Sequence, residues 1–279
     1  YDPTQADLDW HNPELRKAVY KVVNFWRSKG VQGFRFDVIN VTGKAQKLVD
    51  STGPDQEKSL YTDTPVVHKY LKEMNANTFG KDPNSITVGE MSSTTIKNSI
   101  EYSKPSEHEL SMVFNFHHLK VDYKNGEKWT KTPFDFMKLK ELFTQWQEKM
   151  DQGGGWNALF WNNHDQPIAL NRFGDPGKYR IKSAEMLATA IHLMRGTPYI
   201  YMGEELGMVN PDYSSMKDYV DVESLNAFKE LKKKGMTAKE AFEIIQTKSR
   251  DNSRTPMHWD ASKYAGFSKV KPWFAKEAR

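Results

Sequence analysis

Short apolar segments alternate with helical patterns along the chain, and this order constrains the fold more than any other feature. Each segment has the length of a buried strand, and its neighbours have helical periodicity. The expected strands are 31–38, 86–90, 112–116, 156–161 and 198–202, and the main expected helices are 13–28, 65–75, 134–150, 181–194 and 225–234. Strands that alternate with helices indicate a parallel sheet with right-handed crossovers.

The first helix shows how local these signals are. Asn12 is a plausible cap, and Pro13 suits the first helical position because its missing N–H needs no partner there. Val22, Val23 and Trp26 fall on one apolar stripe of this helix. We expect that stripe to face the core.

Acidic residues stand at the carboxyl ends of four expected strands. They are Asp37, Glu90, Asp165 and Glu204. In a parallel α/β barrel the strand ends converge on one mouth, where the chemistry takes place. A doubly wound sheet also binds ligands at this edge, but no Gly-rich phosphate loop opens any of the helices. The sequence therefore favours a barrel.

The first expected strand carries two charged residues, Arg35 and Asp37, within an apolar run. At a period of two, both side chains lie on one face of the strand. Burying charges is costly unless they are paired or used. Two interpretations remain open from this segment alone: a carboxylate that an arginine orients into a site, or a structural salt bridge at a strand end.

The residue types narrow the chemistry. Glycoside hydrolysis needs a carboxylate nucleophile and a carboxylic acid, about 5 Å apart if the anomeric configuration is retained. His164 and Asp165 lack the helical spacing of an HExxH metal site, and the chain has no cysteine to supply a thiolate ligand. No G-x-S-x-G segment supports a serine triad. Paired carboxylates therefore point to a glycosidase more than to a metallohydrolase.

Charge and hydropathy bear on partners and location. The net charge of +4 is mild and comes from mixed charges, so we expect no nucleic-acid partner. No apolar run is long enough to span a bilayer, and the first ten residues do not form a signal peptide. The lack of cysteine fits a reducing compartment. We expect a cytoplasmic protein with no membrane partner.

Several blocks of sequence resemble one family in order and in spacing. Residues 33–40, 87–90 and 160–166 resemble the second, third and fourth conserved regions of the α-amylase superfamily of glycoside hydrolases. Residues 5–9 are similar to the block before its strand 4, residues 196–205 to its strand 8, and residues 250–257 to a loop of its oligo-1,6-glucosidase relatives. The resemblance covers essentially the whole chain.

This resemblance implies an α/β fold, a (β/α)8 TIM-barrel catalytic domain present only in part, with strands 4 to 8. Residues 1–279 would be an internal, partial catalytic domain without strands 1 to 3, the small inserted domain and the C-terminal β-domain. Residues 206–260 would form a charged insertion after strand 8. Five strands cannot close an eight-stranded barrel, so the chain alone could be an inactive fragment whose open sheet edges pair with another copy.

The resemblance also implies roles for individual residues. Asp37 matches the nucleophile, and Arg35 matches the arginine that keeps it ionised and aligned. Glu90 matches the general acid/base, which needs a less polar setting than the nucleophile. Asp165 matches a third carboxylate that grips sugar hydroxyls, and His164 matches the histidine beside it. With these carboxylates intact and no membrane segment, a carbohydrate-binding transporter subunit of the superfamily is disfavoured.

The segment after the third expected strand is basic where oligo-1,6-glucosidases and dextran glucosidases tend to be acidic. It carries His117, His118, Lys120 and Lys128. A phosphate dianion needs cationic donors, and this pattern resembles the trehalose-6-phosphate hydrolases. The implied substrate is a phosphorylated carbohydrate, trehalose 6-phosphate, cleaved to glucose and glucose 6-phosphate by double displacement. The alternatives are a solvated basic loop and an oligo-1,6-glucosidase or dextran glucosidase that acts on unphosphorylated α-glucosides.

Arg254, in the 250–257 loop, is a further candidate for binding substrate. One position departs from the family pattern, because relatives usually have arginine where this chain has Ile168. The loss of that arginine would weaken the set of phosphate donors. We expect no cofactor and no metal ligand among the candidate residues, and the resemblance leaves a calcium site possible in the part of the enzyme that precedes this chain.

Overall fold

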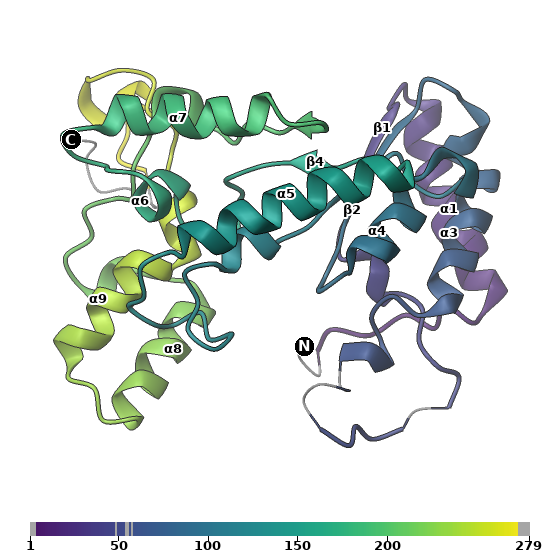
Figure 1. Cartoon of the computed structure of the whole chain (residues 1–279), viewed down its shortest axis with the longest axis horizontal. Helices are drawn as coiled ribbons and strands as arrows, with labels where there is room; N and C mark the ends of the chain where they lie inside the picture. The colour runs from purple at the N-terminus through teal and green to yellow at the C-terminus, as the bar shows by residue number, and fades with distance from the viewer. Residues whose placement is uncertain (1–3, 48, 54–55, 57, 273–279) are drawn as a thin grey trace. The chain divides into compact units, whose positions relative to one another are not determined.

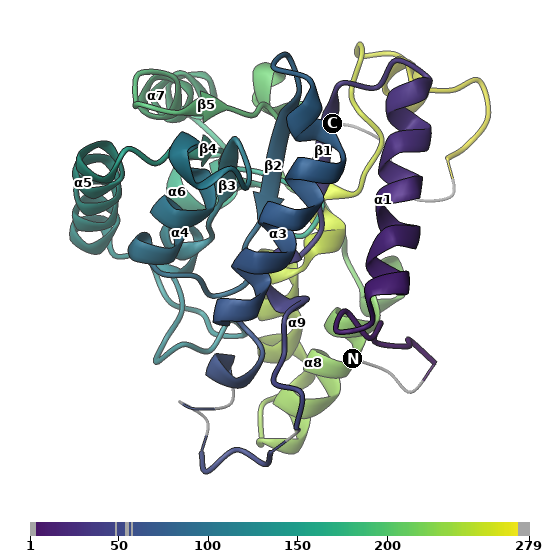
Figure 2. The same ribbon diagram turned by 90° about the vertical axis from the view of Figure 1, so that its right-hand side faces the viewer.

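The computed structural model describes residues 4–47, 49–53, 56 and 58–272 of the 279-residue chain. Figure 1 labels its helices and three of the strands, and Figure 2 also labels β3 and β5. Contacts within the chain divide it into two compact units, which we describe one at a time. The first unit comprises Tyr1–His118, Glu141–Ala158 and Arg195–Thr197, and the second comprises Leu119–Lys140, Leu159–Met194 and Pro198–Arg279.

A parallel sheet lies at the centre of the first unit. Its strands are β1 (Gly33–Phe36), β2 (Ile86–Glu90) and β3 (Met112–Phe114), in the order β1-β2-β3. Gly33 pairs with Ile86, and Val88 pairs with Met112. β1 therefore lies at an edge of this sheet, and Asp37 and Glu90 stand where two neighbouring strands end.

Helices α1 (Pro13–Ser28), α3 (Pro65–Asn77) and α4 (Ile96–Ser103) belong to the same unit. Figure 2 looks onto α3 and α4, with β1 to β3 behind them. Their buried faces share one core with the strands. Its fully buried members include Val67, Leu71, Met74, Met91, Tyr102, Val113 and Met150.

The apolar stripe expected on α1 is only partly buried. Tyr20 and Val23 are the buried residues of this helix, whereas Val22 and Trp26 are 58% and 52% exposed. The expectation that the whole stripe faces the core is wrong. The reason is that α1 packs against α3 and the 3₁₀ helix η3 (Phe79–Lys81), which cover one side of it.

The second unit is mostly helical. It holds α6 (Ala169–Phe173), α7 (Arg180–His192), α8 (Val222–Lys233) and α9 (Ala238–Lys248). A core around Tyr213, Tyr219 and Ile245 lies beside α8 and α9. Helix α5 (Phe136–Gly153) and the paired short strands β4 (Ala158–Leu159) and β5 (Thr197–Pro198) each contribute residues to both units.

The order of the sheet elements follows the chain. A parallel bridge joins Val113 of β3 to Asn157 next to β4, and β4 pairs with β5. Each of the five expected strands overlaps an observed strand, but β1, β3, β4 and β5 are shorter than predicted, and β5 shares only Pro198 with the expected range 198–202. No helix in the described ranges has both the length and the apolar character that a membrane span requires.

Candidate active site

Arg35 connects the two carboxylates at the ends of β1 and β2. Its Nη1 donates a hydrogen bond to Oδ1 of Asp37, which follows β1 directly, and its Nη2 donates to Oε2 of Glu90 over 2.5 Å. Parallel pairing of Phe36 with Gly89 places the two strand ends side by side. One guanidinium therefore serves two predicted catalytic carboxyl groups.

The surroundings of Glu90 favour its protonated form. Only 8% of Glu90 is exposed. Burial raises the pKa of its carboxyl group, the charge of Arg35 lowers that pKa, and the hydrogen bond and negative charge of Asp37 raise it again, so that it lies above the ordinary value. The backbone N–H of Val38 donates to Oε2 of Glu90 over 3.3 Å. A carboxyl that retains its proton can act as a general acid.

Asp165, in the second unit, lies in a different charge environment. Its Oδ1 accepts hydrogen bonds from Nη1 of Arg250 at 2.9 Å and from Nη2 of Arg254 at 2.8 Å. Nε2 of His164 lies 3.3 Å from Oδ2 of Asp165, and the carbonyl of His164 accepts a bond from Nε of Arg254. The structure thus brings three predicted site residues together: His164, Asp165 and Arg254.

The sequence analysis missed Arg250 and Asp221. Nε and Nη2 of Arg250 donate to the two oxygens of Asp221, each over 2.9 Å, while its Nη1 holds Asp165. Asp221 is buried. Burial alone would raise the pKa of Asp221, but the hydrogen bonds and charge of Arg250 lower it below its ordinary value. The available signal was Arg250 itself, four residues before Arg254 in the loop that resembles the oligo-1,6-glucosidases.

Asn162 connects the two ends of the turn that carries Asp165, and Glu204 binds the Asn162 side chain. Nδ2 of Asn162 donates to Oε2 of Glu204 over 2.7 Å, and Oδ1 of Asn162 accepts from the N–H of Ala169 over 2.6 Å. Burial raises the pKa of Glu204 above its ordinary value, although the bond from Asn162 opposes this. The strand-end acid Glu204 thus has a structural use in the second unit.

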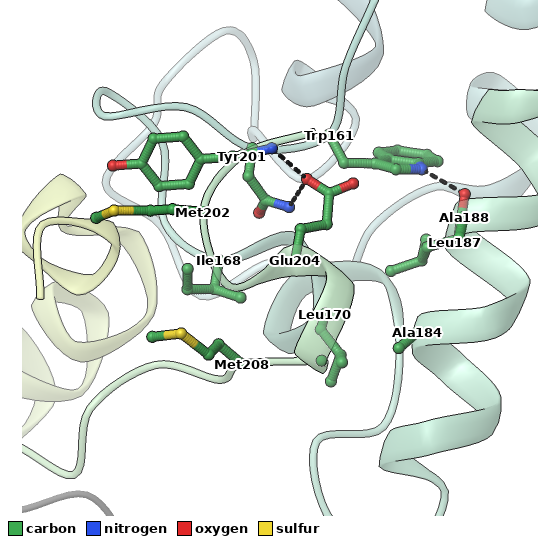
Figure 3. Close-up of a pocket in the computed structure, with 12 residues that line it drawn as sticks. Trp161, Ile168, Leu170, Ala184, Leu187, Ala188, Tyr201, Met202, Glu204 and Met208 are labelled. Atoms are coloured by element: carbon green, nitrogen blue, oxygen red, sulfur yellow. Dashed lines mark hydrogen bonds between the residues drawn. The ribbon is translucent and has the colours of Figure 1, made fainter. Parts of the chain in front are cut away.

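Figure 3 shows Glu204 in a pocket whose wall is mostly apolar, with Ile168, Leu170 and Met208 on one side. The cavity is about 20 Å³, which is room for about one water molecule. It is too small to be a sugar pocket. Ile168, where the resemblance leads us to expect an arginine, is buried in this wall, and its N–H donates to Oδ1 of Asn210.

The predicted phosphate donors have different surroundings. Nε2 of His117 donates to the carbonyl of Thr94 over 2.7 Å. His118 is only 7% exposed, and its ring packs on Phe143. Lys120 is exposed. Of these three, Lys120 is the one whose side chain solvent reaches most readily.

Lys128, the fourth predicted donor, is engaged within the second unit. Its Nζ lies 2.9 Å from both carboxylate oxygens of Glu223 and 4.7 Å from the ring centre of Trp129. Burial lowers the pKa of Lys128, while Glu223 raises it, and the net pKa lies below the ordinary value. These contacts give Lys128 a structural role that the sequence did not indicate.

A buried triad also supports the turn that carries Asp165. Nε and Nη2 of Arg172 donate to Asp122 at 3.0 and 2.8 Å, and Nζ of Lys248 lies 2.6 Å from Asp122. Arg172 also donates to Oε1 of Gln166, the residue after Asp165. Burial would raise the pKa of Asp122, but Arg172 and Lys248 lower it below its ordinary value. The triad fixes Gln166 and so one side of the turn.

One cluster within the described residues has the ligand types of a metal site: His68, Glu101 and Glu109, in the first unit. Its atoms are already used in ion pairs. Nδ1 of His68 lies 3.0 Å from Glu109, and Nζ of Lys72 lies 3.7 Å from Glu109. The cation of Lys72 beside the carboxylate suits an ion-pair cluster better than a divalent ion.

Comparison with known proteins decides the family. The model of the alpha-amylase catalytic domain matches residues 1–279. The chain is 56% identical to trehalose-6-phosphate hydrolase of Bacillus subtilis (strain 168), over 98% of this chain and 48% of that protein. It is 47% identical to oligo-1,6-glucosidase of Parageobacillus thermoglucosidasius, over 98% of this chain and 49% of that protein.

This chain belongs to the alpha-amylase family. Among solved structures it is similar to trehalose-6-phosphate hydrolase of Bacillus licheniformis, with a TM-score of 0.93 and 57% identity over 98% of this chain and 49% of that one. The predicted fold, a TIM barrel present only in part, is confirmed. The chain spans about half the length of the curated relatives it matches.

Proposed function

We propose that this chain is part of a retaining α-glucosidase that hydrolyses trehalose 6-phosphate to glucose and glucose 6-phosphate. The observation that carries the proposal is the bridge of Arg35 between Asp37 and Glu90. Two carboxyl groups that share one guanidinium, with the pKa of Glu90 raised by burial, form a nucleophile and an acid next to each other.

In the first step, an oxygen of Asp37 attacks the anomeric carbon while the bond from that carbon to the glycosidic oxygen breaks. Glu90 gives its proton to this oxygen, which leaves as a hydroxyl group of the departing sugar. A covalent glucosyl ester of Asp37 and an ionised Glu90 result. Arg35 stays bound to both groups and offsets the negative charge that moves from one carboxyl to the other.

In the second step, ionised Glu90 takes a proton from water, and the water oxygen attacks the anomeric carbon. The ester bond to Asp37 breaks, glucose is released with its original configuration, and Glu90 is again protonated. The support for retention is that both carboxyl groups bind one guanidinium, that of Arg35, which suits the short separation of about 5–5.5 Å typical of retaining enzymes better than the about 6.5–9.5 Å of inverting enzymes.

The phosphorylated substrate is the finer part of the proposal. Its support is the higher identity to trehalose-6-phosphate hydrolase, 56%, than to oligo-1,6-glucosidase, 47%. The exposed Lys120 supports it as a cation that could meet a phosphate. The uncharged, buried Ile168 supplies no cation for a phosphate, and this weakens the support for a phosphorylated substrate relative to the alternative, an oligo-1,6-glucosidase acting on unphosphorylated α-glucosides.

The test uses the longest natural polypeptide that contains this sequence. We expect a higher kcat/KM for trehalose 6-phosphate than for isomaltose, and proton NMR should detect α-glucose as the first product before mutarotation. Faster hydrolysis of isomaltose would support the oligo-1,6-glucosidase alternative. Initial release of β-glucose would contradict double displacement.

A pair of lysine variants separates substrate binding from stability. Lys120→Ala should raise KM for trehalose 6-phosphate by about tenfold, which corresponds to the loss of one charge-assisted contact. KM for isomaltose should not change. Lys128→Ala is the control, since Lys128 is paired with Glu223 and its loss should lower the melting temperature without changing the ratio of the two substrates. An equal rise in KM for both substrates in Lys120→Ala would refute the phosphate role.

The 279 residues alone are a separate case. We infer that they are catalytically inactive in isolation, because within the described residues β1 is the outermost strand of its sheet and the five strands found there do not close an eight-stranded barrel. Gel filtration and an activity assay on this chain test the inference. We expect association through the open edge and no turnover, whereas a monomer that hydrolyses either substrate would contradict it.

A further inference from the structure

Asn40 is a buried, uncharged amide in the segment that follows Asp37. It lies three residues after Asp37, in the 3₁₀ helix η1 (Ile39–Val41), and its exposure is 0%. A buried amide without partners would be costly. All of its contacts described below lie within the first unit, so they concern the loops that carry Asp37 and Glu90.

The side chain of Asn40 binds both polar groups of one peptide residue. Its Oδ1 accepts from the N–H of Ser92 over 2.8 Å, and its Nδ2 donates to the carbonyl of Ser92 over 2.9 Å. Ser92 lies two residues after Glu90. Asn40 therefore joins the segment that follows Asp37 to the segment that follows Glu90 through a bidentate pair.

Asp63 fixes the orientation of that amide. Nδ2 of Asn40 donates its second hydrogen bond to Oδ1 of Asp63 over 2.8 Å, and the carbonyl of Asn40 accepts from the N–H of Asp63 over 3.0 Å. Asp63 in turn accepts from Tyr102 and Asn98, each over 2.9 Å. Both N–H donors of the Asn40 side chain are thus satisfied, and the amide has one arrangement that fits all partners.

The backbone between Asp37 and Asn40 needs such support. Val38 has φ 40° and ψ 42°, in the left-handed region, which is strained for a β-branched residue. Ile39 packs closely on β2, since a Cβ on Gly89 would lie 3.1 Å from Cγ2 of Ile39. The N–H of Val38 reaches Glu90 from this conformation. The strained turn persists because its surroundings hold it.

We propose that Asn40 is a positioning residue, which holds the ends of β1 and β2 at the separation that the Asp37 and Glu90 chemistry requires. The inference rests on the proposed function. Asn40 touches neither carboxylate in the hydrogen bonds described, and acts through Ser92 and through the turn at Val38. Displacing a catalytic group by about 1 Å can cost about 100-fold in rate, so a clamp of this kind controls kcat more than substrate affinity.

The experiment compares Asn40→Ala with Asn75→Ala in the longest natural polypeptide that contains this sequence. Asn75 is a matched control, because its Nδ2 donates to the carbonyl of Glu109, away from the segments after β1 and β2. Circular dichroism gives the melting temperature of each variant. Isomaltose and trehalose 6-phosphate are both assayed, so that the substrate preference does not affect the comparison.

We expect Asn40→Ala to lower kcat by about 100-fold and to change KM by less than about threefold. Asn75→Ala should keep kcat within about threefold of the parent even though it loses a long-range hydrogen bond. If kcat falls in both variants, and in each to the extent that the melting temperature falls, the role of Asn40 is merely structural and the inference is overturned.

A second variant keeps the shape of the side chain. Asn40→Asp retains an acceptor for the N–H of Ser92 but presents an oxygen where Nδ2 donates to Asp63 and Ser92. Protonation of the new carboxyl restores one donor. The ratio of the variant's kcat to the parent's should therefore rise as pH falls, at temperatures where circular dichroism shows the variant to be folded at every pH, so that a pH-dependent loss of stability does not contribute. A ratio independent of pH would overturn the inference.

The outcomes separate the two proposals. A parent protein that is inactive on both substrates refutes the proposed function, and the role of Asn40 falls with it. An active parent with an equally active Asn40→Ala variant refutes the positioning role alone. Failure of both Asn40 variants to fold would assign Asn40 to folding and would also overturn the inference.

Discussion

The two units treat their carboxylates differently. In the first unit, one arginine, Arg35, serves the two carboxyl groups of Asp37 and Glu90. In the second unit, Arg250 and Arg254 both bind Asp165. Burial raises the pKa of Glu90 in spite of the opposing charge of Arg35, whereas the side chain of Asp165 is 33% exposed and contacts two arginines. The buried Glu90 is thus suited to proton transfer, and Asp165, which two arginines hold, is suited to binding.

Glu90→Gln should produce the largest effect that distinguishes the units. Loss of the general acid should lower kcat/KM for a disaccharide by about 10²–10⁴-fold. For an aryl glucoside with a good leaving group, kcat/KM should fall much less, because the aryl group can depart without receiving a proton. Steady-state assays of both substrates check this.

The pH dependence has a defined sign. The donor is the protonated form, so the parent's kcat/KM should fall as pH rises through the raised pKa of Glu90, and Glu90→Gln should lose that decline. Asp165→Asn is the control from the second unit. Asp165→Asn should lower kcat/KM for the disaccharide and for the aryl glucoside by the same factor. A fall in kcat/KM for the disaccharide alone would remove the distinction between the units.

Within the second unit, Arg254→Ala and Arg250→Ala should differ in kind. Arg254 donates to Asp165 and to the His164 carbonyl, so its loss should lower kcat/KM by about tenfold to 100-fold, the value of one charged hydrogen bond. Arg250→Ala also leaves buried Asp221 without its bidentate partner. Arg250→Ala should therefore lower the free energy of unfolding by about 2 kcal/mol, which lies between the energies of exposed and of buried ion pairs. Urea unfolding with parallel kinetics checks both, and identical stabilities of the two variants would contradict the structural role of Arg250.

Glu204→Gln should give the smallest effect. The pKa of Glu204 is raised by burial in the folded protein, so the folded state binds more protons than the unfolded state between the two pKa values. The contribution of Glu204 to stability therefore falls as pH rises from about 4.3, the ordinary value for glutamate, through the folded pKa.

A glutamine keeps an acceptor for Asn162 and has no charge to bury. At low pH, the free energy of unfolding of Glu204→Gln should lie within about 1 kcal/mol of that of the parent. As pH increases, the variant should become more stable relative to the parent. Urea unfolding at several pH values measures this difference. A difference that does not change with pH would contradict the burial of an ionisable Glu204.

Local signals predicted the elements that depend on local contacts. The bounds of α1, Pro13–Ser28, agree with the prediction, because Oδ1 of Asn12 accepts from the N–H of Glu14 as a cap should. Strand β2 runs over Ile86–Glu90, as expected. Strand β5 is only Thr197–Pro198, so residues 199–202 of the expected strand lie outside the sheet, before the turn at Gly203, whose φ is 85°. An apolar run marks a strand better than it marks the strand's end.

Long-range partners could not be predicted in the same way. Arg250 and Asp165 are 85 residues apart in sequence, and Lys128 and Glu223 are 95 apart. Each has many possible counterions of the right charge, and tertiary structure alone selects one. The pairing of Arg35 with Asp37 was accessible because strand periodicity puts both on one face. The catalytic roles of these residues stay predictions.

The most direct test of the central claim is to trap the glucosyl ester. The longest natural polypeptide that contains this sequence would be treated with a fluorinated glucosyl fluoride, whose ester hydrolyses slowly, then digested and mapped by mass spectrometry. We predict one added fluoroglucosyl group on the peptide that contains Asp37, and none in Asp37→Ala. A label on Glu90 or Asp165, or turnover of a natural substrate by Asp37→Ala, would contradict the account.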